Sequence, residues 1–303
     1  MKAKENKIKI SNQLIFYVSM MTVPILMFIV LNIIINVEYV LLAFKEYNPL
    51  DNTYSFVWFK NFGRVLKEFA LEESVLRTSF FNSVVLWAWR TFLGMPLAIL
   101  FSFYIARKKT FSGFYYTVLF LPTIISTMVM IFLYSYFMDS VVPTVTQAMF
   151  AREISPPLGN VNSQWSMVIL YNIVFSFGTY VLFFIGSITG ISEEIIESAQ
   201  LDGATPFTEL IYIVIPLIFP TISTFIVVRI ANMFADTAGL YSFFMQGAQH
   251  QTIGYYLYKD IMSNRATRGD YPYYSAIGLL FSAIIIPITL IVRKLLEKVA
   301  TVE

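Results

Sequence analysis

The chain lacks cysteine altogether and has a single histidine, His250, among its 303 residues. It therefore cannot form a disulfide or a thiolate metal site, and one histidine cannot supply a paired-histidine metal motif. Charged residues are scarce as well: Asp, Glu, Lys and Arg make up 13% of the chain, whereas a typical soluble domain has about 25%. We expect no metal site, and an ordinary soluble domain is excluded.

Long hydrophobic runs account for this low charge. Hydrophobic residues make up 57% of the chain, and a transmembrane helix needs about 20 of them in succession. The first run is longer than the hydrophobic part of a signal peptide and no A-x-A cleavage site follows it, so we interpret it as a retained span. The sequence predicts an all-α, polytopic membrane protein, with a tail at 1–13 and a transmembrane domain over 14–303. Its six predicted transmembrane helices are 14–37, 78–105, 111–138, 165–188, 211–235 and 272–292.

The distribution of Lys and Arg predicts the orientation of these spans. An even number of spans places both termini on one side of the membrane. With the termini inside, ten Lys and Arg lie in inner segments and nine in outer loops, and the inner ones are concentrated beside the span ends, where the positive-inside rule applies. We expect a multi-pass protein of the cell membrane with both termini in the cytoplasm. The net charge of +2 is dispersed over separate loops, and we expect no nucleic-acid partner.

The segment between the fourth and fifth spans, residues 189–210, is unusually acidic. It contains the stretch EEIIESAQLDGATPFTEL, with five acidic residues and no Lys or Arg. Ser192 fits the N-cap of a helix, and Glu193 and Glu194 would lie at the positive end of its dipole. The sequence therefore predicts a short helix on the cytoplasmic side.

A corner and a second helix follow. Gly203 supplies the left-handed residue that ends a helix, and Thr205 and Pro206 fit the N-cap and first position of the next. One interpretation is a hairpin lying among lipid headgroups. Helices in that position favour Lys and Arg, however, and this segment has none. Its acidic residues fit a basic protein surface better.

The spacing of these residues resembles the EAA loop of ABC importer permeases. That pattern reads E-A-A, two residues, D-G-A, and then an aromatic and apolar series with prolines. The matching residues are Glu197-Ser198-Ala199, Asp202-Gly203-Ala204, Phe207, Leu210, Ile213, Ile215, Pro216 and Pro220. Ser198 stands where the pattern has alanine, and Ile215 where it has leucine. With six spans and the loop between the fourth and fifth, the resemblance to type I importers of the carbohydrate class covers nearly the whole chain.

The resemblance implies a fold, a function and partners. The fold would be that of a type I ABC importer permease. The chain would pass a sugar or oligosaccharide from an extracellular or periplasmic solute-binding protein into the cytoplasm, beside a second homologous permease that is usually a different chain. A cytoplasmic ABC ATPase dimer would bind ATP and Mg, so this chain would carry no cofactor. Its ATPase-coupling residues would be Glu197, Ser198, Ala199, Asp202, Gly203, Ala204 and Phe207.

The chain has no nucleotide-binding motif of its own. No G-x-x-x-x-G-K-[ST] P-loop is present, and no Gly-Lys pair occurs anywhere in the sequence. We expect this chain not to be an enzyme. A separate ATPase must then supply the energy for transport.

Polar side chains within the predicted spans are few, and they are candidates for the substrate pathway because burying them in lipid is costly. Arg90 lies twelve residues into the second span, about 18 Å from its outer end. It is expected to face a partner or a water-filled cavity. Arg229 lies nearer the outer end of the fifth span, and it can also be interpreted as reaching the outer interface.

Two stripes of polar residues flank the acidic segment, and helical spacing would place each stripe on one face. In the importers that this chain resembles, sugar contacts come from the two spans beside the coupling loop. Amides, hydroxyls and aromatic rings suit sugars, although hydrogen bonding between helices explains each residue alone equally well. The stripes are Asn172, Ser176 and Tyr180 in the fourth span, and Arg229, Asn232 and Asp236 at the end of the fifth.

Three other functions are alternatives: an ABC permease for a non-sugar solute, an ion-coupled secondary transporter and a membrane enzyme. Ion-coupled transporters usually place carboxylates in the middle of the membrane, but all nineteen Asp and Glu lie in loops, tails or at span edges. A membrane enzyme needs a catalytic set, which one histidine, no cysteine and no intramembrane aspartate pair do not supply. The non-sugar permease stays open as an alternative.

Overall fold

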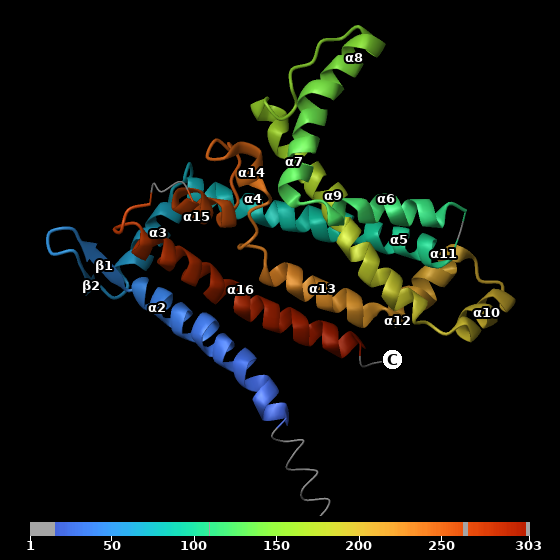
Figure 1. Ribbon diagram of the computed structural model, residues 1–303, viewed down its shortest axis with the longest axis horizontal. Helices are drawn as coiled ribbons and strands as arrows, with labels where there is room; N and C mark the ends of the chain where they lie inside the picture. Colours follow the sequence, from blue (N-terminus) through green and yellow to red (C-terminus); the bar gives the residue numbers. More distant parts are fainter. Residues whose placement is uncertain (1–15, 109, 263–265, 301–303) are drawn as a thin grey trace, which may run out of the picture. The chain divides into compact units, whose positions relative to one another are not determined.

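The computed structural model describes residues 16–108, 110–262 and 266–300, apart from the side chains of Ser176 and Ala300. The predicted tail at 1–13 lies outside the described residues. The helices and strands, shown in Figure 1, are α2 (Ile35–Leu42), β1 (Lys45–Asn48), β2 (Thr53–Phe56), α3 (Lys60–Ala70), α4 (Val75–Trp89), α5 (Met95–Ala106), α6 (Ser112–Ile124), α7 (Thr127–Tyr136), α8 (Val142–Phe150), α9 (Val161–Thr189), α10 (Glu193–Leu201), α11 (Pro206–Glu209), α12 (Ile215–Leu217), α13 (Phe219–Ala231), α14 (Leu240–Phe244), α15 (Ile253–Met262) and α16 (Tyr271–Ala300).

Several of these helices join end to end into membrane-spanning lengths. Short π-helical turns provide the joints, at Ile29–Ile34, Arg90–Gly94, Phe137–Val141 and Leu210–Val214. Within the described residues, the continuous helices long and apolar enough to cross a bilayer are Phe16–Leu42, Val75–Ala106, Thr127–Phe150, Val161–Thr189 and Tyr271–Val299. A bent pair, Pro206–Leu217 and Phe219–Ala231, brings these five to six when it is counted as one span. The predicted all-α architecture of a polytopic membrane protein is confirmed in this form.

The third span differs from the single helix expected over 111–138. The helix α6 ends at Ile124, and α7 begins at Thr127 after two extended residues. Pro122 removes a backbone donor near the end of α6, and the hydroxyl of Ser126 accepts a hydrogen bond from the Val129 N–H at 3.4 Å as the N-cap of α7. Figure 1 shows α6 and α7 pointing in different directions from this joint. The prediction of one continuous helix was therefore wrong.

The fifth span is bent by 69° between its two helices. The bend lies at Ile218, between Pro216 and Pro220. Proline has no N–H to donate and its ring clashes with the preceding helical turn, so two prolines four residues apart favour a break. The second part ends at Ala231 rather than at residue 235. This early end matters for the residues that follow it.

The chain divides into two compact units: Met1–Lys67 with Ala266–Leu280, and Glu68–Arg265 with Phe281–Glu303, as far as their residues are described. The first unit contains an antiparallel hairpin of β1 and β2, in which Lys45 pairs with Phe56. The side-chain amide of Asn61 donates to the carbonyl oxygens of Ala43 at 2.9 Å and Lys45 at 2.7 Å. This short hairpin, the one sheet among the described residues, was not predicted.

The second unit contains the residues discussed from here on. Its core lies where α5 packs along α9, and buried residues of the bent fifth span complete it. The core includes Met95, Ala98 and Ile99 from α5, Phe177, Val181, Phe184 and Ile188 from α9, and Leu210, Val214, Ile218 and Ile222 from the fifth span. Gly178 of α9 allows close packing, since a Cβ there would lie 2.4 Å from the Leu119 carbonyl oxygen of α6. Around this core, many large apolar side chains are exposed, as expected for helices that face lipid.

Candidate functional site

The acidic segment folds into an elbow (residues 192–209) made of α10, a corner and α11. The Ser192 hydroxyl caps α10 by accepting from the Glu194 N–H at 3.3 Å. The Thr205 hydroxyl caps α11 by accepting from the Thr208 N–H at 3.3 Å, and Pro206 opens that helix. These local structures confirm the predicted helix, corner and helix.

The corner itself is closed by backbone hydrogen bonds. Gly203 has a φ of +84°, a conformation that costs residues with a Cβ about 1–2 kcal/mol. The Gly203 N–H donates to the Gln200 carbonyl at 3.0 Å, and the Ala204 N–H donates to the Ala199 carbonyl at 2.9 Å. This pair of bonds is the Schellman motif, which satisfies the last carbonyls of a helix. The elbow is therefore a stiff element.

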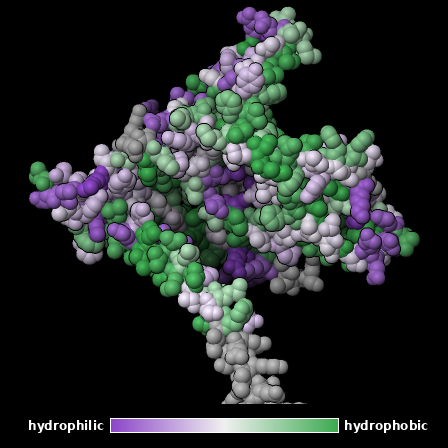
Figure 2. Space-filling model, viewed as in Figure 1, coloured by the Kyte–Doolittle hydropathy of each residue, from purple (hydrophilic) through white to green (hydrophobic). Residues whose placement is uncertain are grey.

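The surface of the elbow combines acidic side chains with large apolar ones. Glu193, Glu194, Glu197 and Asp202 are exposed, and Figure 2 shows a hydrophilic patch over α10. Beside them, Leu201 is 88% exposed and Phe207 is 67% exposed. All seven predicted coupling residues lie in this elbow: Glu197, Ser198, Ala199, Asp202, Gly203, Ala204 and Phe207. Exposed apolar side chains set among charged ones are typical of a protein-binding surface.

One acidic residue of the elbow has a different environment. Glu209 is only 3% exposed and forms an ion pair with Arg107, the residue that follows α5. Its other carboxylate oxygen accepts from the Gln200 side chain of α10 at 3.4 Å. Glu209 thus connects α10, α11 and the end of α5 in the second span. The sequence analysis did not identify Arg107 or Glu209 as a pair. The signal that could have found Glu209 is its position as a single acidic residue directly before the apolar fifth span.

Two neighbouring cavities share part of their lining: the first lies between α4, α9 and the end of α13, and the second between α6, α7, α9 and the segment 236–242. The first has a volume of about 280 Å³ and the second about 560 Å³; sites for small molecules measure roughly 300–1,000 Å³. Arg90, Tyr180 and Asp236 line both cavities. The first is also lined by Arg229, Asn232 and Trp87, among others. The second is also lined by Asn172, Tyr171, Phe175, Thr123, Thr127 and Ser242, among others.

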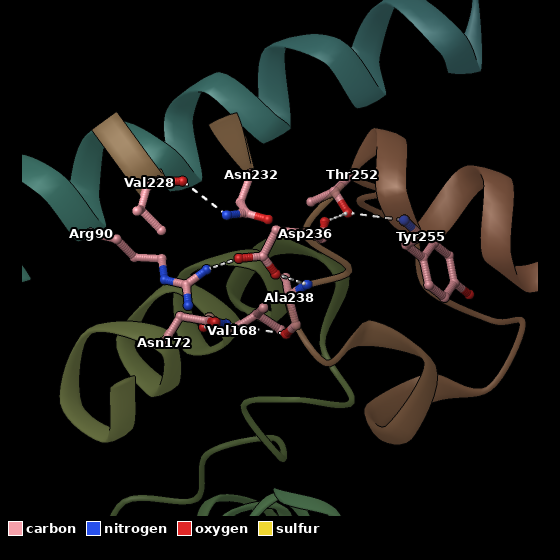
Figure 3. Close-up of polar contacts among 9 residues, drawn as sticks. All are labelled: Arg90, Val168, Asn172, Val228, Asn232, Asp236, Ala238, Thr252 and Tyr255. Carbon is pink, nitrogen blue, oxygen red and sulfur yellow. Dashed lines mark hydrogen bonds and ion pairs between the residues drawn. The ribbon is translucent and has the colours of Figure 1, made fainter. Parts of the chain in front are cut away.

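Arg90 and Asp236 form an ion pair across these cavities (Figure 3). Arg90 stands at the start of the π-helical turn that joins α4 to α5; such turns are frequent at functional sites. The second carboxylate oxygen of Asp236 accepts from the Ala238 N–H at 2.8 Å. The expectation that Arg90 faces a partner is confirmed, and it faces a cavity as well.

Arg229 does not reach the outer interface, so that interpretation of the sequence was wrong. Its side chain is buried, with 8% exposed, and its guanidinium carbon lies 4.2 Å from the centre of the Tyr180 ring. Arg229 lines the first cavity near the end of α13. Tyr180 stabilises it there through a cation–π contact.

The prediction that Arg229, Asn232 and Asp236 share one face of a helix was also wrong. The helix ends at Ala231 and Asn232 caps it, so Asp236 lies beyond the helix, after the turn at 232–235. The three residues nevertheless line one cavity, because the chain folds back after the helix. The amide of Asn232 donates to the Val228 carbonyl at 2.9 Å.

In the fourth span, Tyr180 lines both cavities and Asn172 lines the second. The side chain of Asn172 is largely buried and donates to the carbonyls of Val168 at 2.9 Å and Ala238 at 3.2 Å. Asn172 therefore also fastens the turn after α13 to α9. The side chain of Ser176 lies outside the described residues.

Residues 252–255, at the start of α15, pack against the backbone of Asp236 and Ala235, and sequence reasoning missed this contact. The Thr252 hydroxyl donates to the Asp236 carbonyl at 2.8 Å, and a Cβ on Gly254 would lie 2.5 Å from the Ala235 carbonyl oxygen. The Tyr255 hydroxyl donates to the Met245 carbonyl at 2.8 Å. Burial raises the pKa of Tyr255, so this donor keeps its proton. The position of Asp236 thus depends on a glycine whose role appears only in three dimensions.

Comparison with known proteins gives these features a context. Residues 90–301 match the family described as binding-protein-dependent transport system inner membrane component. The arabinooligosaccharides transport system permease protein AraP of Bacillus subtilis (strain 168) is 21% identical over 233 residues, 75% of this chain and 73% of AraP. The sn-glycerol-3-phosphate transport system permease protein UgpA of Agrobacterium fabrum (strain C58 / ATCC 33970) is 25% identical over 248 residues, 80% of this chain and 82% of UgpA.

The fold also has a match among solved structures. The crystal structure of a bacterial ABC transporter involved in the import of the acidic polysaccharide alginate superposes with a TM-score of 0.75 at 19% identity, covering 97% of this chain and 99% of that chain. This likeness shows a shared fold. Since the family match extends over most of the sequence, the chain belongs to the inner membrane components of binding-protein-dependent transport systems.

Proposed function

We propose that this chain is the transmembrane permease subunit of an ATP-driven importer that carries a sugar or oligosaccharide from a solute-binding protein into the cytoplasm. The observation that carries the proposal is the elbow: a capped, hydrogen-bonded and acidic corner between the fourth and fifth spans, in a member of a binding-protein-dependent transport family.

The substrate class is supported by the relatives and by the cavities. One relative is a permease for arabinooligosaccharides, and the transporter with the similar fold imports a polysaccharide. The second cavity is lined by the hydroxyls of Thr123, Thr127 and Ser242 and by aromatic side chains. Hydroxyls match the donors and acceptors of a sugar, and aromatic faces match the apolar faces of its rings.

The elbow would seat in a cleft of a cytoplasmic ATPase, of which the importer needs two copies. The ATPase would bind ATP and Mg, since this chain has no P-loop. A stiff elbow moves as one piece when the ATPase dimer closes, and Arg107 would carry that movement to the second span. A single chain has one elbow, so a second permease, homologous and most simply a different chain, would present the other.

Transport assays test this proposal. The assembly would be isolated from native membranes through a tag on this chain, its partners identified by mass spectrometry, and uptake measured in proteoliposomes with the solute-binding protein. Glu197→Lys reverses a charge on the exposed face, and Gly203→Pro forbids the φ of +84° because proline is fixed near −65°. We expect each to lower ATP-driven uptake at least about tenfold.

Glu193→Gln serves as the matched control. It changes an exposed acid of the same helix whose position at the first turn contributes only about 0.3–1 kcal/mol to helix stability, so uptake should stay near that of the unmodified chain. Unchanged uptake by both Glu197→Lys and Gly203→Pro would contradict ATPase docking on the elbow. Uptake driven by an ion gradient without ATP would contradict the whole proposal.

A permease for a non-sugar solute is the second candidate. The observation in its favour is the relative that transports sn-glycerol-3-phosphate, a small polyol phosphate. Competition for uptake in the same proteoliposomes distinguishes the two: inhibition by oligosaccharides favours the first, and inhibition by small phosphate esters alone favours the second.

A further inference from the structure

The first cavity is lined by two arginines, Arg90 and Arg229, and by one carboxylate among its described lining residues. Arg90 is paired with Asp236, which is the only carboxylate among the described residues that line either cavity. This one carboxylate therefore serves two arginines, and Arg229 also lies against the ring of Tyr180. A cation–π contact offsets part of the cost of burying a charge, about 2 kcal/mol or more when desolvated, but it supplies no negative charge.

Hydrogen-bond donors are also in surplus here. Within the described part of the chain, Nε and Nη2 of Arg229, Nε of Arg90 and Nε1 of Trp87 are buried without an acceptor. Both carboxylate oxygens of Asp236 are already engaged, one by Arg90 and one by the Ala238 N–H. Buried donors without acceptors are rare in native proteins, and these donors mark a region in which positive groups outnumber acceptors.

The geometry of a guanidinium indicates which chemical group would complement this positive charge. A guanidinium presents two parallel N–H groups that fit the two oxygens of a carboxylate. Neutral hydroxyls would satisfy the donors but would leave the two arginines with one carboxylate between them. We propose that the first cavity binds the carboxylate of an acidic saccharide, with Arg229 as its counter-charge, while the sugar rings occupy the neighbouring second cavity. This inference rests on the proposed function and narrows its substrate class to sugars that carry acid groups.

Tyr180 would have two roles in this arrangement. Its ring lies against Arg229, and it lines both cavities. It therefore holds the guanidinium in place and forms part of the wall of both cavities. A saccharide that binds along this path would place its acid group on one side of Tyr180 and a sugar ring on the other.

Equilibrium binding to the isolated membrane assembly tests the inference. The assembly is used without its solute-binding protein, so that any selectivity belongs to the membrane domain. The probes are trigalacturonate and its fully methyl-esterified form, which have the same rings and hydroxyls and differ in charge. We expect trigalacturonate to bind at least about 30-fold more tightly than the ester, which is the effect of one buried charge pair. Arg229→Gln should remove this preference, and Arg229→Lys should keep part of it.

Arg293→Gln is the matched control, since Arg293 is exposed and pairs with Glu297 in α16; it should leave both affinities unchanged. Equal binding of the two probes by the unmodified assembly, or an unchanged preference in Arg229→Gln, would overturn the inference. Loss of a second permease from the Arg229→Gln assembly would also overturn it, by assigning Arg229 to an acidic partner residue. If the assembly binds or imports the neutral ester alone, the inference fails while the proposed sugar importer stands; if it transports no saccharide, the proposed function fails too.

Discussion

At the scale of single residues, two glycines of α9 have opposite surroundings. A Cβ on Gly178 would lie 2.4 Å from the Leu119 carbonyl oxygen, whereas a Cβ on Gly186 would have no atom within 4 Å. Backbone atoms cannot rotate away as a side chain can. The difference between the two positions is therefore one of helix packing, since both lie in the same helix.

Gly178→Ala should separate α6 from α9 and destabilise the protein by about 1–3 kcal/mol, the usual cost of overpacking. Gly186→Ala should be neutral or slightly stabilising, because alanine is the better helix former. Thermal unfolding of the two purified variants in the same detergent measures the difference. Equal melting temperatures would mean that α6 does not pack this closely on α9.

From the sequence it was possible to predict which polar residues lie at the site, but not what surrounds each of them. Arg90 was expected to meet a partner or a cavity and does both. Arg229 lines the first cavity near the end of α13. Gly254 gave no signal at all, since its role depends on the carbonyl of Ala235, which lies far from it in sequence. A one-dimensional pattern gives depth along an ideal helix and cannot give the direction of a bent one.

At the scale of elements, the elbow was predictable because its folding is local. Caps, the left-handed glycine and the prolines act over three to five residues, so sequence spacing suffices to place them. The tie between Glu209 and Arg107 was not predictable in this way. The two residues are about a hundred positions apart and meet only when α5 and the fifth span pack together.

We predict that this ion pair stabilises the elbow and couples it to the second span. Arg107→Gln or Glu209→Gln leaves one charge without its partner in a mostly buried place, which should cost about 1–3 kcal/mol because Arg107 keeps some contact with solvent. Each single variant should also import less solute per ATP hydrolysed.

The double variant Arg107→Gln/Glu209→Gln removes both charges and should be more stable than the sum of the single effects predicts. Unfolding and coupled uptake of the four proteins form a double-mutant cycle. Strictly additive effects would show that the two side chains do not interact.

At the scale of the whole molecule, the absence of cysteine makes orientation measurable without background. Ser198 is exposed on the elbow, and Ser155 is exposed in the connection between α8 and α9. With both termini in the cytoplasm, these positions lie on opposite sides of the membrane. Single substitutions Ser198→Cys and Ser155→Cys should therefore react with a membrane-impermeant maleimide in membrane vesicles of opposite orientation.

Ser155→Cys should be labelled in right-side-out vesicles and Ser198→Cys in inside-out vesicles. Production of the ATPase together with this chain should then lower the labelling of Ser198→Cys several-fold, because the elbow would be covered. Labelling of both positions from the same side would contradict the six-span topology. Labelling in the reverse pattern would contradict the predicted orientation.

The sequence by itself determined the number of spans, their approximate places and the elbow, since each follows from hydrophobic length or from interactions between close neighbours in the chain. Only the tertiary structure decided the broken third span and bent fifth span, the Glu209–Arg107 pair and the cavity in which Arg90 and Arg229 share the carboxylate of Asp236. These features depend on which helices lie side by side. Helix packing joins residues that are distant in sequence, and hydrophobicity alone does not specify such pairs.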